Sequence, residues 1–100
     1  MVIKLGQQGC RVTSGSITKN IPIYPCKAVD TTGAGDAFCG GFVAGMVRTG
    51  DPFVAAAMGN VSASFVVQDF GGVHALHIKE QDAQNRLDYV LKHTTIDEEN

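Results

Sequence analysis

One segment, residues 29–42, constrains this chain more than any other. It has the sequence VDTTGAGDAFCGGF, in which acids, threonines and closely spaced glycines stand directly before an apolar run. A loop that only reverses the chain does not need this order of acid, hydroxyl and glycine. A helix that only packs does not need anionic side chains at a glycine-rich entrance. The segment therefore predicts a loop that leads into a helix and carries chemistry where the two meet.

The residues after this loop predict a helix over residues 36–48. Phenylalanine and glycine recur there at i, i+3 and i+4 spacing and so share one face of the helix. These residues are Phe38, Gly41, Phe42 and Gly45. Glycine lowers helix propensity by about 1 kcal/mol relative to alanine, so its repeated use needs a reason. We expect another element to approach this helix closely, and neighbours on several of its sides because it is apolar nearly all round.

A second helix is predicted over residues 52–67. Gly50 suits the C-terminal cap of the first helix, because glycine adopts the left-handed conformation found there. Asp51 then suits the N-cap of the next helix, and Pro52 its first helical position, where no backbone N–H is needed. These three residues predict where one helix ends and the next begins.

The remaining predicted elements are short strands and one amphipathic helix. Residues 2–5 are apolar and partly β-branched, which predicts a buried strand that ends at a turn over residues 6–9. Next we expect a hairpin of residues 10–13 and 16–19 around Ser14 and Gly15, followed by an extended or edge segment at 21–26. After the two helices we expect a break at Gly71 and Gly72 and a strand at 73–78. The last predicted element is a helix at 80–93, whose apolar face consists of Ala83, Leu87, Val90 and Leu91.

These elements predict an α/β fold that is incomplete on its own. A fully apolar strand such as residues 2–5 normally lies inside a parallel sheet that is covered on both faces. The chain offers few partner strands for it. We therefore interpret residues 1–93 as the C-terminal portion of a larger α/β domain and residues 94–100 as an acidic, frayed tail.

Composition excludes several classes of partner. The formal net charge is -2 and there is no basic run, so nucleic acid is not expected as a partner. No signal segment and no apolar stretch of membrane-spanning length is present, so no membrane partner is expected. Cys10, Cys26 and Cys39 are far apart and form no C-x-x-C pair, which indicates small buried thiols in a reduced, cytoplasmic setting.

The glycines at the helix entrance predict an anion site. Backbone N–H groups of Gly33, Ala34 and Gly35 can point in one direction, and at a helix start such groups lack intrahelical partners. Phosphate is the common guest of this arrangement. At Gly35 we expect positive φ and close backbone approach to be required.

Asp36 turns the anion site into a predicted phosphotransfer site. A carboxylate beside an anion hole repels phosphate unless that phosphate is delivered to something the acid holds. An acid that accepts a hydroxyl proton, next to donors that neutralise a migrating phosphoryl group, is the minimal site for that reaction. The alternative is that Asp36 is only an N-terminal helix acid and the glycines only form the turn.

Other signatures are absent from the sequence. The G-x-G-x-x-G pattern fails because Phe38 stands where the third glycine belongs. There is no G-K-[ST] and no H-R-D or D-F-G motif. His74 and His77 suggest a metal at first sight, but no cysteine or acid stands at a useful spacing to complete the ligands.

The motif in residues 29–42 resembles the second signature of the ribokinase-like (PfkB) carbohydrate kinase family. VIKLGQQG at residues 2–9 resembles the strand and glycine turn of that family, and the paired helices also fit. The resemblance implies the C-terminal part of a three-layer α/β/α domain and an ATP-dependent kinase that phosphorylates a hydroxyl of a sugar. It implies that Asp36 is the catalytic base and that Gly33, Ala34 and Gly35 form the anion hole.

The same resemblance implies further ligand contacts. Lys4 and Gly6 would lie near the nucleotide phosphates, and Asn60, with Gly59 nearby, would line the adenine pocket. A monovalent cation, K⁺, would take ligands from the positions of Asp30 and Thr32, and Mg²⁺ would travel with ATP. Plainer roles remain open: a solvated lysine for Lys4, a hydrogen bond to a neighbouring loop for Asn60, and turn formation for Asp30 and Thr32.

Three functions follow as alternatives. The leading one is a sugar kinase, the second is a nucleoside kinase of the same fold, and the third is a non-catalytic nucleotide- or anion-binding fragment. The family's N-terminal half, with most acceptor contacts, is absent from this sequence, so we expect the fragment alone to be inactive. A homodimer is a further expectation.

Overall fold

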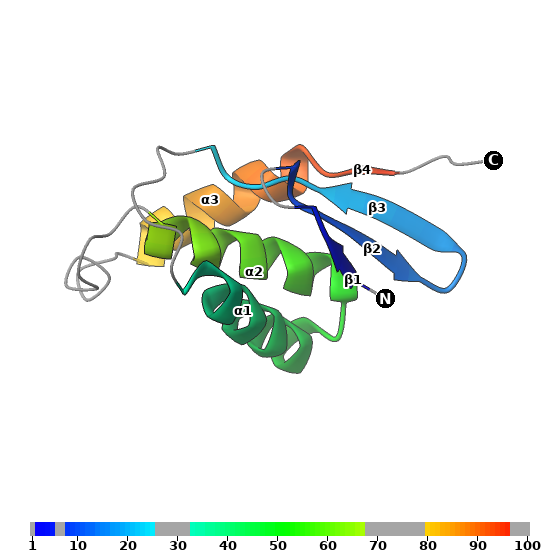
Figure 1. Cartoon of the computed structure of the whole chain (residues 1–100), viewed down its shortest axis with the longest axis horizontal. Helices are drawn as coiled ribbons and strands as arrows, with labels where there is room; N and C mark the ends of the chain where they lie inside the picture. Colours follow the sequence, from blue (N-terminus) through cyan, green and yellow to red (C-terminus); the bar gives the residue numbers. More distant parts are fainter. Residues whose placement is uncertain (1, 6–7, 26–32, 68–79, 97–100) are drawn as a thin grey trace.

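The computed structural model describes residues 2–5, 8–25, 33–67 and 80–96. Within these ranges a four-stranded sheet in the order β1-β2-β3-β4 packs against helices (Figure 1). The strands are β1 (Val2–Lys4), β2 (Cys10–Ser14), β3 (Ile17–Ile21) and β4 (Thr95–Ile96), and the helices are α1 (Ala34–Thr49), α2 (Pro52–Val67) and α3 (Glu80–Lys92). Helix α2 contacts β2, β3 and both other helices, so it is the centre of the arrangement.

The predicted hairpin is confirmed. Strands β2 and β3 are antiparallel and are joined at Gly15, whose φ of 62° suits a tight turn. Side chains alternate across the sheet, so that Cys10, Val12 and Ile21 share the side of the hairpin that faces the helices. The opposite side is polar: Arg11 Nε donates to Asn20 Oδ1 at 3.2 Å, and the hydroxyls of Thr13 and Thr18 lie 2.9 Å apart.

The strand predicted at residues 2–5 forms, but the expectation of a buried strand in a parallel sheet is wrong for this structure. Strand β1 pairs with β2 in the antiparallel sense, and Ile3 and Leu5 are 44% and 38% exposed. The reason is the short connection to β2, in which the Leu5 N–H donates to the Gly9 carbonyl at 2.8 Å. A connection this short reverses the chain, whereas parallel strands need a long crossover.

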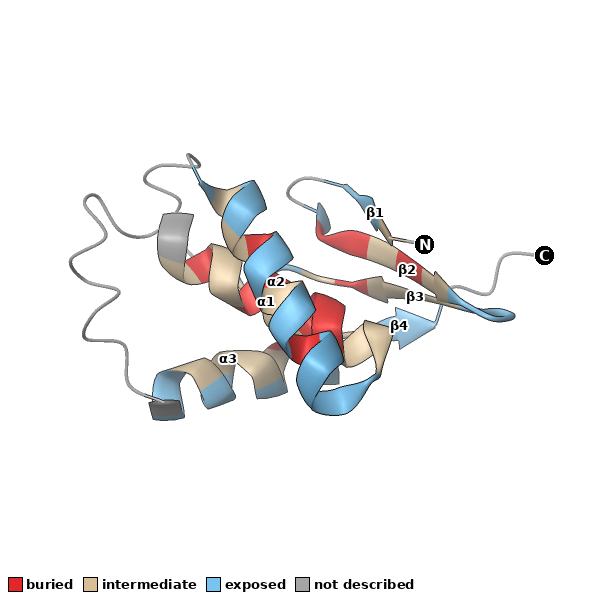
Figure 2. Cartoon of the chain, turned by 90° about the horizontal axis from the view of Figure 1, so that it is seen from below, coloured by how far each residue is buried: buried red, intermediate tan, exposed pale blue. Residues whose placement is uncertain are grey.

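Helices α1 and α2 pack closely through their small residues, as the glycines predicted. A Cβ added at Gly41 would lie 2.6 Å from Oγ of Ser62, and one added at Gly45 would lie 2.6 Å from Cα of Ala55. No real Cβ makes contacts this short, so glycine allows the two helix backbones to approach. On the outer side of α1 the expected neighbours are absent among the described residues, and much of this helix is coloured as exposed in Figure 2. Val43 and Val47 are 60% and 81% exposed.

The predicted junction between the two helices is confirmed. Gly50 has a φ of 68° and donates its N–H to the Met46 carbonyl at 2.9 Å. Oδ1 of Asp51 then accepts the N–H of Phe53 at 2.8 Å and that of Val54 at 3.4 Å, which caps α2. These contacts fix where the chain turns from one helix into the next.

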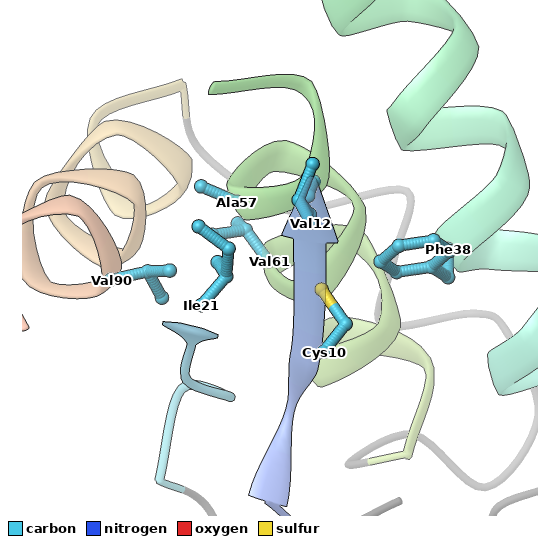
Figure 3. Packing of buried hydrophobic residues seen from close by; sticks show 8 residues of the cluster. Cys10, Val12, Ile21, Phe38, Ala57, Val61 and Val90 are labelled. Atoms are coloured by element: carbon cyan, nitrogen blue, oxygen red, sulfur yellow. The ribbon is translucent and has the colours of Figure 1, made fainter. Parts of the chain in front are cut away.

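The hydrophobic core lies between the hairpin, α2 and α3. Figure 3 shows Cys10 and Val12 on β2 beside α2, with Ile21 next to Val61 and Val90. Val90 is fully buried, so the predicted apolar face of α3 is confirmed at that position, although Leu91 is 37% exposed. The core therefore joins residues from both ends of the chain.

Helix α3 is also held by an arginine that stacks on aromatic rings. The Arg86 guanidinium lies 4.0 Å from the ring centre of Phe65 and 4.6 Å from that of Tyr24, and Nη1 donates to Ser64 Oγ at 2.8 Å. A guanidinium combines stacking with directed hydrogen bonds, which an ammonium cannot do. Arg86 thereby links α3 to α2 and to the segment that follows β3.

Two expectations need correction: that residues 94–100 form a frayed tail, and that the cysteines are buried. Thr95 and Ile96 pair with Asn20 and Lys19 as strand β4, so this part of the expected frayed tail is ordered by sheet hydrogen bonds. Cys10 is a buried free thiol as expected, whereas Cys39 is free but exposed, because it lies on the outer side of α1. In the described ranges no helix has the length and apolar character needed to cross a membrane.

Candidate active site

The N-terminus of α1 presents backbone N–H groups without helical partners. Gly33 stands at the N-cap with a φ of 84°, and the first helical hydrogen bond runs from the Ala37 N–H to the Gly33 carbonyl at 2.9 Å. The N–H groups of Ala34, Gly35 and Asp36 precede that bond and so have no acceptor inside the helix. No side chain of the described residues caps this end. The geometry is that of an anion site at the positive end of a helix dipole.

Asp36 lies in the first turn of α1 and is exposed. The helix starts two residues earlier than the sequence predicted, so Asp36 is the third helical residue rather than the first. Its backbone N–H belongs to the anion site, while its carboxylate is open to solvent. The acid is thus accessible from solvent beside N–H groups without helical partners, and its role as a base stays a prediction.

Strand alternation brings Lys4 to the same place. Lys4 is paired with Cys10 in the sheet, and successive residues of a strand point to opposite sides, so Lys4 shares the inward side with Cys10. Its Nζ lies 5.0 Å from the centre of the Phe38 ring. The same atom lies 3.6 Å from the position that a Cβ on Gly35 would occupy. The ammonium and the helix dipole therefore add positive potential at one point.

The expected reason for Gly35 needs correction. Among the described glycines, positive φ occurs at Gly9, Gly15, Gly33 and Gly50, so Gly35 has ordinary helical geometry. Gly33, at the N-cap, is the residue of this loop that needs glycine's conformational freedom. A Cβ at Gly35 would lie 3.6 Å from the Lys4 Nζ, an ordinary van der Waals contact, so an alanine would fit at this position.

Asn60 is buried between α2 and the end of β3. Its Nδ2 donates to the Pro22 carbonyl at 2.9 Å and to the Ile21 carbonyl at 3.2 Å, and it lies 3.9 Å from the Cys10 sulfur. This is the plainer alternative for Asn60, a hydrogen bond to a neighbouring segment. Contact with adenine stays a prediction.

Gly59, the other residue predicted near adenine, contacts Phe38. A Cβ on Gly59 would lie 2.7 Å from Cδ2 of that ring. The missing Cβ lets one edge of the ring approach the backbone of α2. The described structure therefore gives Gly59 a packing role between α1 and α2.

The thiol of Cys10 lies beneath this site. Burial raises the pKa of Cys10, while the hydrogen bond from Asn60 and the charge of Lys4 act in the opposite direction. The thiol is 1% exposed, so it is part of the core rather than a nucleophile facing solvent.

Several predicted site residues lie outside the described ranges. Gly6, Asp30 and Thr32 are among them, as are His74 and His77 and the strand predicted at 73–78. Their predicted roles stay predictions. Within the described ranges, no group of His, Cys, Asp and Glu side chains is arranged to hold a metal ion.

Sequence reasoning assigned no role at the site to Phe38. Its ring lies under the Lys4 ammonium and is 6% exposed. The feature of the sequence that could have indicated Phe38 is that an aromatic residue follows the predicted base, Asp36, by two positions. Without the register of β1 against β2, nothing indicated which cation that ring would meet.

A comparison of folds gives the class of protein. The crystal structure of a ribokinase from Thermotoga maritima superposes with a TM-score of 0.66 and 28% sequence identity, covering 92% of this chain and 29% of that one. The fold is thus an α/β fragment of the ribokinase type, which confirms the predicted fold class. Residues 1–79 match the pfkB family of carbohydrate kinases, and the chain belongs to that family.

Curated relatives are kinases with different acceptors. An inositol 3-kinase of Arabidopsis thaliana is 37% identical over 71% of this chain, and a ribokinase of Bacillus subtilis is 39% identical over 71%. An adenosine kinase of Saccharomyces cerevisiae is 41% identical over 60%. The chain spans 20%, 24% and 18% of these relatives, respectively, so it represents a minor part of their length.

Proposed function

We propose that this chain supplies the phosphoryl-transfer centre of an ATP-dependent sugar kinase. The observation that carries the proposal is the N-terminus of α1, where N–H groups without helical partners, an exposed acid in the first turn (Asp36) and the ammonium of Lys4 beside Gly35 occur together. Each component has a task in moving a phosphoryl group to a hydroxyl. Activity belongs to the full-length kinase, and the fragment alone is inactive.

The reaction uses Asp36 as the general base. The carboxylate accepts the proton of the acceptor hydroxyl while the oxygen of that hydroxyl forms a bond to the γ-phosphorus of ATP. The bond from that phosphorus to the β–γ bridging oxygen breaks, and ADP leaves with the electron pair. Negative charge on the transferred oxygens is stabilised by the N–H groups of the predicted anion hole, Gly33, Ala34 and Gly35, with the neighbouring N–H of Asp36 as a further donor before the first helical hydrogen bond. Because these donors are backbone groups of a packed helix, they need little rearrangement during the reaction.

The remaining contacts complete the nucleotide site. Lys4 and Gly6 would contact the phosphates of ATP, and Gly59 and Asn60 would contribute to the adenine side. Mg²⁺ bound to ATP would supply positive charge at the phosphates, where the described residues of this chain offer no metal-binding cluster of their own. Asp30 and Thr32 offer oxygen ligands for K⁺, a hard cation.

The acceptor is a sugar or a related polyol. The ribokinase and inositol 3-kinase relatives support this class. A nucleoside acceptor is the second candidate, supported by the adenosine kinase relative. A non-catalytic nucleotide-binding role is the third, and Asp36 separates it from the others because only a kinase needs a base at that position.

The test is phosphoryl transfer by the full-length protein with an Asp36→Asn variant. Ribose, fructose, myo-inositol and adenosine are offered as acceptors with Mg-ATP, and ADP release is measured. We expect turnover on a sugar or polyol, and we expect the variant to lower kcat by about 10²- to 10⁴-fold, as the loss of a general base does. The affinity for ATP should change little. Normal turnover by the Asn variant would overturn the base assignment.

A further inference from the structure

The geometry points to Phe38 as a positioning residue that holds the Lys4 ammonium over the N-terminus of α1. The inference rests on the proposed function, because it concerns how the phosphate-binding charge is kept in place. Lys4 Nζ lies 5.0 Å from the Phe38 ring centre, within the range of a cation–π interaction. The same atom is 3.6 Å from the site of a Gly35 Cβ, so the ring and the helix start define one location for the charge.

An aromatic holder suits a phosphate-binding lysine better than a carboxylate would. A lysine has a flexible stem, and an exposed ammonium samples many rotamers unless something restrains it. An acid would restrain it but would also neutralise it. The ring face attracts the cation electrostatically and takes none of its N–H donors. Among the described residues no carboxylate forms an ion pair with Lys4, so its charge stays available for an anion.

The ring itself is fixed by its surroundings. Phe38 is 6% exposed and stacks on Phe42 with ring centres 6.1 Å apart and an interplanar angle of 21°. Gly59 of α2 lies against its edge so closely that a Cβ there would come within 2.7 Å. Because the Phe38 ring is fixed between α1 and α2, it restricts the positions that the flexible Lys4 ammonium can take. The position of the charge thus depends on α2 as well as on β1.

The chain contains a matched control. Lys19 Nζ lies 4.5 Å from the ring centre of Phe53, which is the same kind of contact at the start of α2 rather than of α1. If aromatic–lysine contacts mattered only for stability, replacing Phe53 or Phe38 would have similar consequences. If Phe38 orients a phosphate-binding charge, only the Phe38 replacement changes nucleotide binding.

The experiment is a double-mutant cycle on ATP affinity in the full-length protein, measured by calorimetric titration. The variants are Phe38→Leu, Lys4→Met, the double variant and Phe53→Leu, with adenosine titrated in parallel. We expect Phe38→Leu to weaken ATP binding by about two- to five-fold, the size of an exposed cation–π contact. In the Lys4→Met background the same change should have no further effect, because the cation is already gone. Adenosine binding and the Phe53→Leu variant should remain near wild type.

A second replacement guards against misfolding of the leucine variant. Trifluorophenylalanine at position 38 keeps the shape of the ring and withdraws electron density from its face, so it should reproduce the loss in ATP affinity with no change in the unfolding midpoint. Full additivity of Phe38→Leu and Lys4→Met, or unaltered affinity with the fluorinated ring, would overturn the inference. Failure of the wild-type protein to bind ATP at all would instead overturn the proposed function, and this inference with it.

Discussion

Gly45 of α1 lies so close to Ala55 of α2 that a Cβ on Gly45 would approach the Ala55 Cα to 2.6 Å and its Cβ to 3.0 Å. Both atoms belong to a buried helix interface, so neither can move aside alone. We predict that Gly45→Val destabilises the protein by about 1–3 kcal/mol or more, the usual cost of overpacking. Urea unfolding followed by circular dichroism measures the change.

Gly40 provides the control for this prediction. It lies on the same helix, but a Cβ there meets nothing within 4 Å. Gly40→Ala should therefore stabilise the protein by about 0.5–1 kcal/mol, because alanine has the higher helix propensity. Equal effects of the two substitutions would contradict the close approach of α1 and α2.

The positive φ of Gly33 should matter for function as well as for stability. Any L-residue there is strained by about 1–2 kcal/mol, and the strain would turn the N–H groups of the helix start away from a bound phosphate. We predict that Gly33→Ala lowers both the free energy of unfolding and the affinity for ATP. Gly15→Ala is the comparison, since Gly15 has a φ of 62° in the hairpin turn and no neighbour within 4 Å. It should lose stability to a similar extent while binding ATP normally.

Asn60 should behave as an anchor of the core. Its replacement by alanine leaves the Ile21 and Pro22 carbonyls without their side-chain donor, and an unsatisfied buried polar group costs about 1–3 kcal/mol. Chemical denaturation of Asn60→Ala measures this cost. Asn20→Ala, which removes a partner of Arg11 on the outer side of the sheet, should cost less because water can replace it. A variant at Asn60 as stable as wild type would contradict the anchoring role.

Cys10 should make stability depend on pH in the alkaline range. Burial raises its pKa above the ordinary thiol value of 9.0, so the folded state keeps a proton that the unfolded chain releases. The contribution to stability is therefore complete below that value and is lost as pH rises through the folded pKa, with a slope of at most about 1.4 kcal/mol per pH unit. Unfolding free energies between pH 8 and 10 should fall less steeply for Cys10→Ala than for wild type.

Local signals in the sequence were sufficient for much of the fold. The turn at Gly15, the cap at Gly50 and the N-cap at Asp51 each involve only neighbouring residues, so their chemistry could be predicted directly. Strand β4 could not, because it depends on the pairing of Thr95 with Asn20, residues far apart in the chain. The direction of β1 was missed because an apolar strand pattern does not specify which neighbour it pairs with.

The candidate site also contains some features that local sequence predicts and others that depend on contacts between distant residues. The glycines and Asp36 stand together in one continuous motif, so the order of residues alone predicts an anion site there. The contact between Lys4 and Phe38 joins a strand to a helix and depends on strand register, which the sequence pattern did not fix. Asn60 and Gly59 make contacts with the end of β3 and with α1 that no local pattern indicated, and their contact with adenine stays a prediction.

The junction at Gly50 and Asp51 holds the C-terminal end of α1, whereas the candidate site is at the N-terminal end of the same helix. Its 16 residues span about 24 Å at 1.5 Å per residue, so a tilt of about 5° at Gly50 would swing the amides at Gly33 by about 2 Å. A displacement of that size exceeds what a phosphoryl-transfer geometry tolerates. Because Gly41 and Gly45 have no side chains, α1 packs directly on α2, and this packing opposes such a tilt. Two residues in the middle of the helix therefore fix the orientation of the N–H groups at its start.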